Sequence, residues 1–73
     1  MKEIYIIDDF IKLGQALKLS GLSQNGADAK LSVQDGLVKV NGETETRRGR
    51  KLVENDVVSY KGSSFTVKKK KHL

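Results

Sequence analysis

The apolar positions of the chain change their period after the first dozen residues. Residues 2–7 are rich in isoleucine and tyrosine that alternate imperfectly with polar side chains, which predicts a β-strand. From Leu13 the spacing becomes helical and places small or apolar side chains on one face: Leu13, Ala16, Leu17 and Ser20. Gly21 follows this face and is suited to end the helix. A helix of about two turns is not stable alone, so it must pack against the rest of the domain.

A second helix is predicted from Gly26 to Gln34. Ser23 or Asn25 is suited to cap its first turn, and Gly36 is suited to follow its last turn. Its apolar positions pair at i, i+4 spacing: Ala27 with Leu31, and Ala29 with Val33. Both helices carry small residues where they would meet, which predicts a compact helical hairpin.

Short apolar stretches separated by turn residues make up the rest of the chain. Residues 37–40 lead into Asn41-Gly42, a pair that favours a type I′ turn because both central positions need a positive φ. Residues 57–60 and 65–69 predict further strands, with a turn over residues 61–64 between them. The predicted order is therefore one strand, two helices and three or four short strands. This order indicates an α+β domain in which two short helices pack on a small, mostly antiparallel sheet.

The length of the chain fits one domain. Its 73 residues are expected to form a single unit that ends in a basic tail at about residues 68–73. Phe10 and Phe65 are assigned to the core because phenylalanine is usually buried.

Positive charge is concentrated in two clusters. The net charge is +5, from 14 lysine and arginine residues and nine acidic residues. One cluster is the basic loop, residues 47–51, and the other lies near the C-terminus: Arg47, Arg48, Arg50 and Lys51, then Lys68 to Lys71. Together they supply eight positive charges, so the rest of the chain carries −3. A mildly acidic body with two basic patches indicates a polyanionic partner, and ordinary surface solvation is the alternative for each patch.

The sequence offers little for catalysis or metal binding. It has no cysteine and one histidine, His72, so neither a thiolate site nor a histidine-based acid–base pair is expected. Asp8 and Asp9 are adjacent, and sequence neighbours seldom face one substrate, so capping or solvation explains them better. The glycines form neither a dinucleotide-binding nor a Walker pattern. We expect no enzyme activity, no small-molecule substrate, no metal and no cofactor.

Membrane association is not indicated either. No apolar run approaches the ~20 residues that span a bilayer, and the N-terminus lacks a basic-then-apolar signal pattern. Four lysines without an apolar helix face give only marginal attraction to a membrane surface. The expectation is a soluble protein of the cytoplasm.

The order of these motifs resembles a known RNA-binding family. The elements that carry the likeness are Lys12-Leu13, Leu17, Gly21, Ala29-Lys30 and Gly36-Leu37-Val38-Lys39-Val40-Asn41-Gly42. Over roughly residues 10–60, this order is similar to the domain named after small-subunit ribosomal protein S-four, also called the alpha-L RNA-binding motif. The run Arg47-Arg48-Gly49-Arg50-Lys51-Leu52 resembles the small stand-alone YaaA/YbcJ-type subgroup.

The resemblance implies a module that docks on structured RNA through the helical hairpin and the strand hairpin beside it. Carried over position by position, the implied RNA-binding residues are Lys12, Lys18, Lys30, Lys39, Arg47, Arg48, Arg50 and Lys51. Many family members have arginine at the position of Lys12 and a Ser-Arg pair at the second helix, where this chain reads Gln24-Asn25-Gly26-Ala27. Lysine is a point charge, whereas arginine can bind phosphate with two hydrogen bonds. We therefore expect the basic loop, more than the helices, to make the main contacts with RNA phosphates in this chain.

The implied partner is ribosomal RNA, transfer RNA or a ribosomal subunit, bound by a monomer. The chain has two tyrosines, two phenylalanines and no tryptophan, and basic and aromatic residues do not alternate. This composition favours docking through phosphates over readout by base stacking. A protein-interaction adaptor that uses the basic loop on an acidic partner is the alternative. Binding that resists RNase and is saturated by one protein would favour that alternative.

Overall fold

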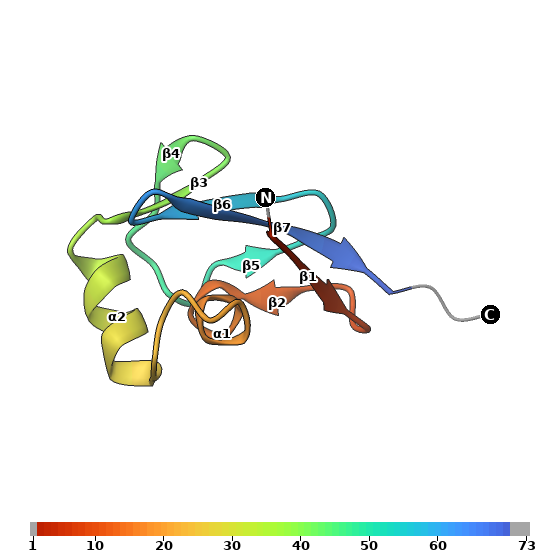
Figure 1. The fold of residues 1–73 in the computed structure, drawn as a ribbon, viewed down its shortest axis with the longest axis horizontal. Coiled ribbons are helices and arrows are strands. Elements are labelled where there is room, and N and C mark those ends of the chain that lie inside the picture. Colours follow the sequence, from red (N-terminus) through yellow and green to blue (C-terminus); the bar gives the residue numbers. More distant parts are fainter. Residues whose placement is uncertain (1, 71–73) are drawn as a thin grey trace.

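Two helices lie against one face of a five-stranded sheet (Figure 1). The structure is a computed structural model, and it describes residues 2–70. The strand order in the sheet is β1-β7-β6-β3-β4, and a separate two-stranded pair joins β2 to β5. The elements are β1 (Lys2–Ile6), β2 (Ile11–Lys12), α1 (Leu13–Leu19), α2 (Gly26–Gln34), β3 (Val38–Val40), β4 (Glu43–Thr44), β5 (Lys51–Leu52), β6 (Val57–Tyr60) and β7 (Ser63–Lys69).

The sheet is mostly antiparallel, as the sequence predicts. Only the pairing of β1 with β7 is parallel, and it brings the first and last strands of the chain side by side. Five strands follow the helices among the described residues, whereas the sequence predicted three or four. The additional strands, β4 and β5, are two residues long, which is too short for an alternating pattern to reveal them.

The Asn41-Gly42 turn has the predicted geometry. Asn41 has a φ of 52° and Gly42 a φ of 85°, and Val40 pairs directly with Glu43 across the two-residue turn. The turn between β6 and β7 is built in the same way by Lys61 and Gly62. It is therefore two residues long, not four, and residues 63 and 64 already belong to β7.

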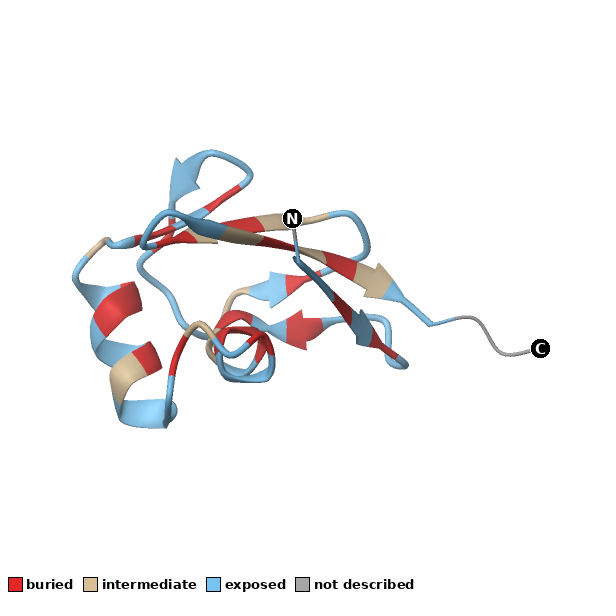
Figure 2. Ribbon diagram, in the orientation of Figure 1, coloured by how far each residue is buried: buried red, intermediate tan, exposed pale blue. Residues whose placement is uncertain are grey.

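The core lies between the sheet and the helices (Figure 2). Leu13, Ala16 and Leu17 of α1 are fully buried, which confirms the predicted helical face. Ser20 is buried too, and its hydroxyl donates to the Leu17 carbonyl at 2.9 Å. The sheet contributes side chains from alternate positions, with Phe65 completely buried at their centre.

Helix α2 begins and ends as predicted, but only one of its two predicted apolar pairs is buried. The Asn25 side chain accepts a hydrogen bond from the backbone of Asp28 at 2.9 Å, so Asn25 is the N-cap. The i, i+4 face of Ala27 and Leu31 is exposed, and Leu31 is 59% accessible. The predicted pair of Ala29 and Val33 is buried, and Ser32 joins it to form the buried stripe. A polar residue can occupy this stripe because the Ser32 hydroxyl lies 2.6 Å from the Tyr60 hydroxyl, which satisfies both groups inside the core.

The C-terminal cluster begins within the sheet. Lys68 and Lys69 belong to β7, and the Lys70 amide donates to the Ile6 carbonyl at 2.7 Å. The Lys69 ammonium also pairs with Asp9 at 2.7 Å. The expected tail therefore does not start at residue 68, and Lys71 and His72 lie outside the described residues. Neither helix in residues 2–70 has the length and apolar character needed to cross a membrane.

Candidate nucleic-acid interface

The basic loop is bound to the first turn of α1. The amides of Leu13 and Gly14 donate to the carbonyls of Arg50 and Arg48, at 2.8 and 2.9 Å. The first amides of a helix have no partner within it, and the N-cap residue Lys12 supplies no side-chain cap. Loop carbonyls take that role. The loop and the helix are thereby held side by side, although more than 30 residues separate them along the chain.

Glu45 also holds the basic loop, through its carboxylate. Its carboxylate is only 7% exposed, and it accepts hydrogen bonds from Arg47 Nε at 3.1 Å and Arg50 Nη1 at 2.9 Å. The backbone amide of Arg47 donates to the same carboxylate at 3.1 Å. These charge-assisted hydrogen bonds, those of Arg47 first, lower the pKa of Glu45 from 4.5 to about 2. Glu45 in turn raises the pKa of the Arg47 guanidinium.

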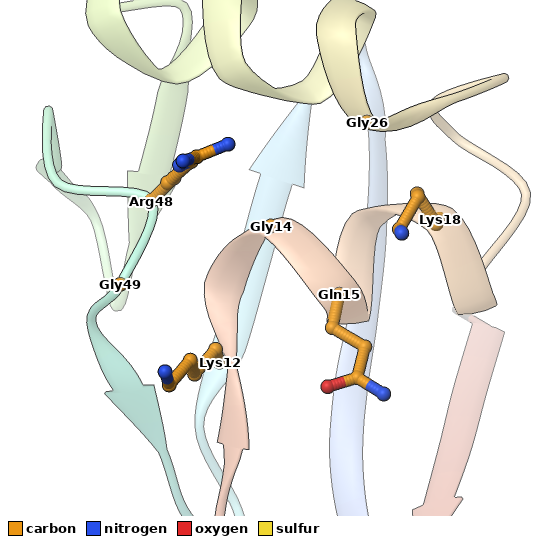
Figure 3. A pocket seen from close by; sticks show the side chains of 7 residues that line it. All are labelled: Lys12, Gly14, Gln15, Lys18, Gly26, Arg48 and Gly49. Atoms are coloured by element: carbon orange, nitrogen blue, oxygen red, sulfur yellow. The ribbon is translucent and has the colours of Figure 1, made fainter.

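Three other cations line one open hollow of about 380 Å³ (Figure 3). Lys12 comes from β2, Lys18 from α1 and Arg48 from the basic loop. We call this the cationic hollow; its lining is Lys12, Gly14, Gln15, Lys18, Gly26, Arg48 and Gly49. Within residues 2–70, the side chains of the three cations form no ion pair and no hydrogen bond. Their charges are therefore available to an external anion.

The cationic hollow continues into two neighbouring hollows. Gly49 also lines the hollow formed by Arg47, Arg50 and Lys51. On the other side, Lys12 and Gln15 also line a hollow with Asp8, Asp9, Phe10 and Ile11, which we call the aromatic hollow. The shared residues make these three hollows one continuous surface along the loop, β2 and α1.

Two of the predicted residues, Lys30 and Lys39, line none of these three hollows. Lys30 is exposed on α2 four residues after Gly26, so it lies on the same side of the helix as the edge of the hollow. Lys39 is exposed between the buried residues Val38 and Val40, and it therefore points to the sheet face away from the helices. The structure brings Lys12, Lys18, Arg48 and the remaining loop cations together, and it separates Lys39 from them.

Sequence reasoning missed several residues of this surface. Gln15 lies midway between Lys12 and Lys18 at helical spacing, so that spacing was the signal for its position. Glu45 had no such signal, because its burial depends on contacts that only the fold creates. Phe10 was assigned to the core, and this is wrong: the residue is 39% exposed, and the Lys51 ammonium lies over its ring. No group of acidic or histidine side chains in the described part of the chain is arranged to hold a metal ion.

Comparison with known proteins identifies the family. The S4 domain model matches residues 4–68. The chain belongs to the S4 domain family. It is 44% identical over 57 residues to the Escherichia coli K12 protein named "Putative RNA-binding protein YbcJ", covering 78% of this chain and 81% of that protein. It is 46% identical over 65 residues to the Bacillus subtilis protein named "Probable ribosome maturation protein RlbA", covering 88% of this chain and 92% of the other.

A solved structure agrees with the fold of this S4 domain. The solution structure of YbcJ from E. coli, described as having an alfaL motif involved in RNA binding, matches with a TM-score of 0.73 at 38% identity. The match covers 93% of this chain and 87% of the YbcJ chain. The family and the α+β fold class predicted from the motif order are both confirmed.

Proposed function

We propose that this S4 domain is a non-catalytic RNA-binding protein that docks on structured RNA, most directly ribosomal RNA or a ribosomal particle in the cytoplasm. The observation that carries the proposal is the cationic hollow, which Lys12, Lys18 and Arg48 line without an acidic partner in the described chain. Unpaired cations on one open surface attract a polyanion and gain from release of its counterions.

The arrangement of charge favours a bound phosphate backbone. Lys12 and Lys51 are direct partners in the antiparallel pairing of β2 with β5. Like charges at directly opposite positions of a ladder repel each other, and an anion between them removes that repulsion. Arg48 lines the cationic hollow together with Lys12 (Figure 3) and can bind a phosphate with two hydrogen bonds. The surface thus offers phosphates both point charges and one directional contact.

The relatives support RNA as the polyanion. One is named for RNA binding and one for ribosome maturation, and both are more than 40% identical to this chain. Cations that β2, α1 and the basic loop hold near one another can match the spacing of phosphates, which differs between folded RNA and B-form DNA. Selectivity in this proposal comes from that geometry.

The proposal is tested by binding in a salt series. Purified ribosomal RNA and a duplex DNA of equal length are titrated with the wild-type protein and with an Arg47/Arg48/Arg50→Ala variant. We expect a preference for RNA, a salt slope of roughly −0.7 to −0.9 per phosphate contact, and a flatter slope in the variant. Equal, weak binding to both nucleic acids that the variant does not change would overturn the proposal. Capture of one acidic protein in the presence of RNase would then identify the loop as a protein-docking surface.

A further inference from the structure

The ring of Phe10 is exposed at the edge of the cationic surface. Phe10 is 39% accessible, whereas Phe65 is completely buried in the core. Phe10 lines the aromatic hollow, which shares Lys12 and Gln15 with the cationic hollow. A ligand whose phosphate is bound by Lys12 therefore has an aromatic ring within its immediate surroundings.

The flexible side chain of Lys51 lies over the ring. The Lys51 ammonium lies 4.7 Å from the centroid of the Phe10 ring. An exposed cation–π contact of this kind is weaker than a charge-assisted hydrogen bond to phosphate. Lys51 also lines the hollow with Arg47 and Arg50, so it can turn toward a phosphate bound there. Such a turn would uncover a ring face beside the bound backbone.

The charges around the ring separate a base from its phosphate. Asp8 and Asp9 lie in the turn before β2 and line the aromatic hollow, while Lys12 lines both hollows. Asp9 is paired with Lys69, whereas Asp8 forms no ion pair with a described residue. A carboxylate repels phosphate but accepts hydrogen bonds from the amino groups of bases. The aromatic hollow is thus suited to an uncharged base whose phosphate lies toward Lys12.

We propose that Phe10 is a stacking platform for one unpaired base of the bound RNA, an inference that rests on the proposed function. When the base stacks, Lys51 leaves the ring for a neighbouring phosphate. The preferred target is then a helix interrupted by a bulge or loop, in which an unstacked base lies next to phosphates that the cationic hollow holds. Bases that leave the helix stack on aromatic side chains in this way, whereas the bases of an intact helix are not accessible.

The first test compares two RNA hairpins that differ by one bulged adenosine. We expect the wild type to bind the bulged hairpin about tenfold more tightly, since stacking on an aromatic side chain has this order of effect. Phe10→Leu should bind both hairpins with the affinity that the wild type has for the fully paired hairpin. Phe10→Tyr should keep the preference for the bulged hairpin. Equal wild-type affinity for both hairpins, or a preference that survives in Phe10→Leu, would overturn the stacking platform and leave the phosphate surface standing. Failure to bind either hairpin would overturn the proposed function as well.

A second test observes the stack directly. The natural chain has no tryptophan, so Phe10→Trp introduces a single fluorophore. We expect its emission to be quenched by the bulged hairpin and not by the paired hairpin. Tyr5→Trp is the matched control, because Tyr5 is 59% exposed and alternates with the buried residues Ile4 and Ile6, so it points away from the helices. Quenching of equal size at both positions would contradict a stack at Phe10.

Discussion

The basic loop contains two kinds of arginine. Arg47 and Arg50 are held by the buried carboxylate of Glu45, at 3.1 and 2.9 Å. Arg48, between them, has no acidic partner among the described residues and lines the cationic hollow with Lys12 and Lys18. The same residue type thus serves two purposes within four positions of the chain: two arginines hold the loop in shape, and one is free to bind.

The ion pairs with Glu45 reduce the positive charge that the basic loop presents to a ligand. The sequence shows four cations in the loop, but the field of two of them is partly compensated by Glu45. An ion pair with a buried member also fixes its partners in space. The loop therefore presents Arg48 from a rigid frame, and a rigid donor loses less conformational freedom when it binds.

The largest expected effect follows from removing two unpaired cations together. The Lys12/Arg48→Ala variant should bind ribosomal RNA about 100-fold more weakly near 0.1 M salt, because two phosphate contacts are lost. The fold should persist, since both side chains are exposed. Binding is measured by fluorescence anisotropy and the fold by circular dichroism.

The matched control for that variant is Lys39/Lys68→Ala. It removes the same charge from two residues that alternate with buried positions and so point to the sheet face away from the helices. The control should lose less than about fivefold in affinity, through long-range attraction alone. Equal losses in the two double variants would mean that total charge, not the cationic hollow, determines binding.

The next largest effect is expected on stability, from removing the Glu45 carboxylate that holds the basic loop. Glu45→Ala should lower the free energy of unfolding by about 2 kcal/mol, because it leaves Arg50 and the Arg47 amide without their acceptor. Urea denaturation measures this change. Glu43→Ala, at an exposed position of β4 two residues earlier, should stay within about 0.5 kcal/mol of the wild type. A Glu45 variant as stable as the Glu43 variant would show that the loop does not depend on these ion pairs.

Acid should lower the free energy of unfolding, because it protonates Glu45 and breaks its ion pairs with Arg47 and Arg50. The pKa of Glu45 is lowered from 4.5 to about 2, so its contribution to stability is complete above pH 4.5 and is lost as the pH falls toward 2. About 1 kcal/mol should be lost by pH 3, allowing for solvent screening of the exposed Arg47. Denaturation at a series of pH values checks this. Glu45→Gln should show a shallower acid dependence, and an unchanged one would place the titration elsewhere.

The sequence predicted the local elements of the fold better than the pairing of distant segments. The helical spacing of Leu13, Ala16 and Leu17 and the Asn41-Gly42 turn are local signals, and both predictions hold. The parallel pairing of β1 with β7 joins the two ends of the chain, so no local pattern reveals it. The bounds of α2 and the burial of Ala29 and Val33 were predictable, whereas the burial of Ser32 depended on its hydrogen bond with Tyr60, a residue of a distant strand.

The candidate site shows the same limit. The basic loop was visible in the sequence as a run of charge, and Lys12 and Lys18 were implied by the resemblance to the family. Their meeting in one hollow required the loop carbonyls to bind the first amides of α1, a contact between distant segments. The exposure of Phe10 was mispredicted for a related reason. A general preference for burial says nothing about a ring at the edge of a two-residue strand.

The smallest expected effect is that of Arg47→Ala. Arg47 is already paired with Glu45, so its removal should weaken RNA binding by only about twofold. Anisotropy titrations at one salt concentration are sufficient to measure this. A loss of tenfold or more would mean that Arg47 leaves Glu45 to bind phosphate.

The most direct test of the account is the salt dependence of ribosomal RNA binding for Arg48→Ala beside Arg47→Ala. The two variants lose the same charge from neighbouring residues, and they differ in whether that charge has an acidic partner among residues 2–70. We expect the slope of log affinity against log salt to become shallower by roughly 0.7–0.9 in Arg48→Ala, which corresponds to one phosphate contact, and to stay at the wild-type value in Arg47→Ala. Equal slopes in the two variants, or a change confined to Arg47→Ala, would contradict the division of the loop into holding and binding arginines.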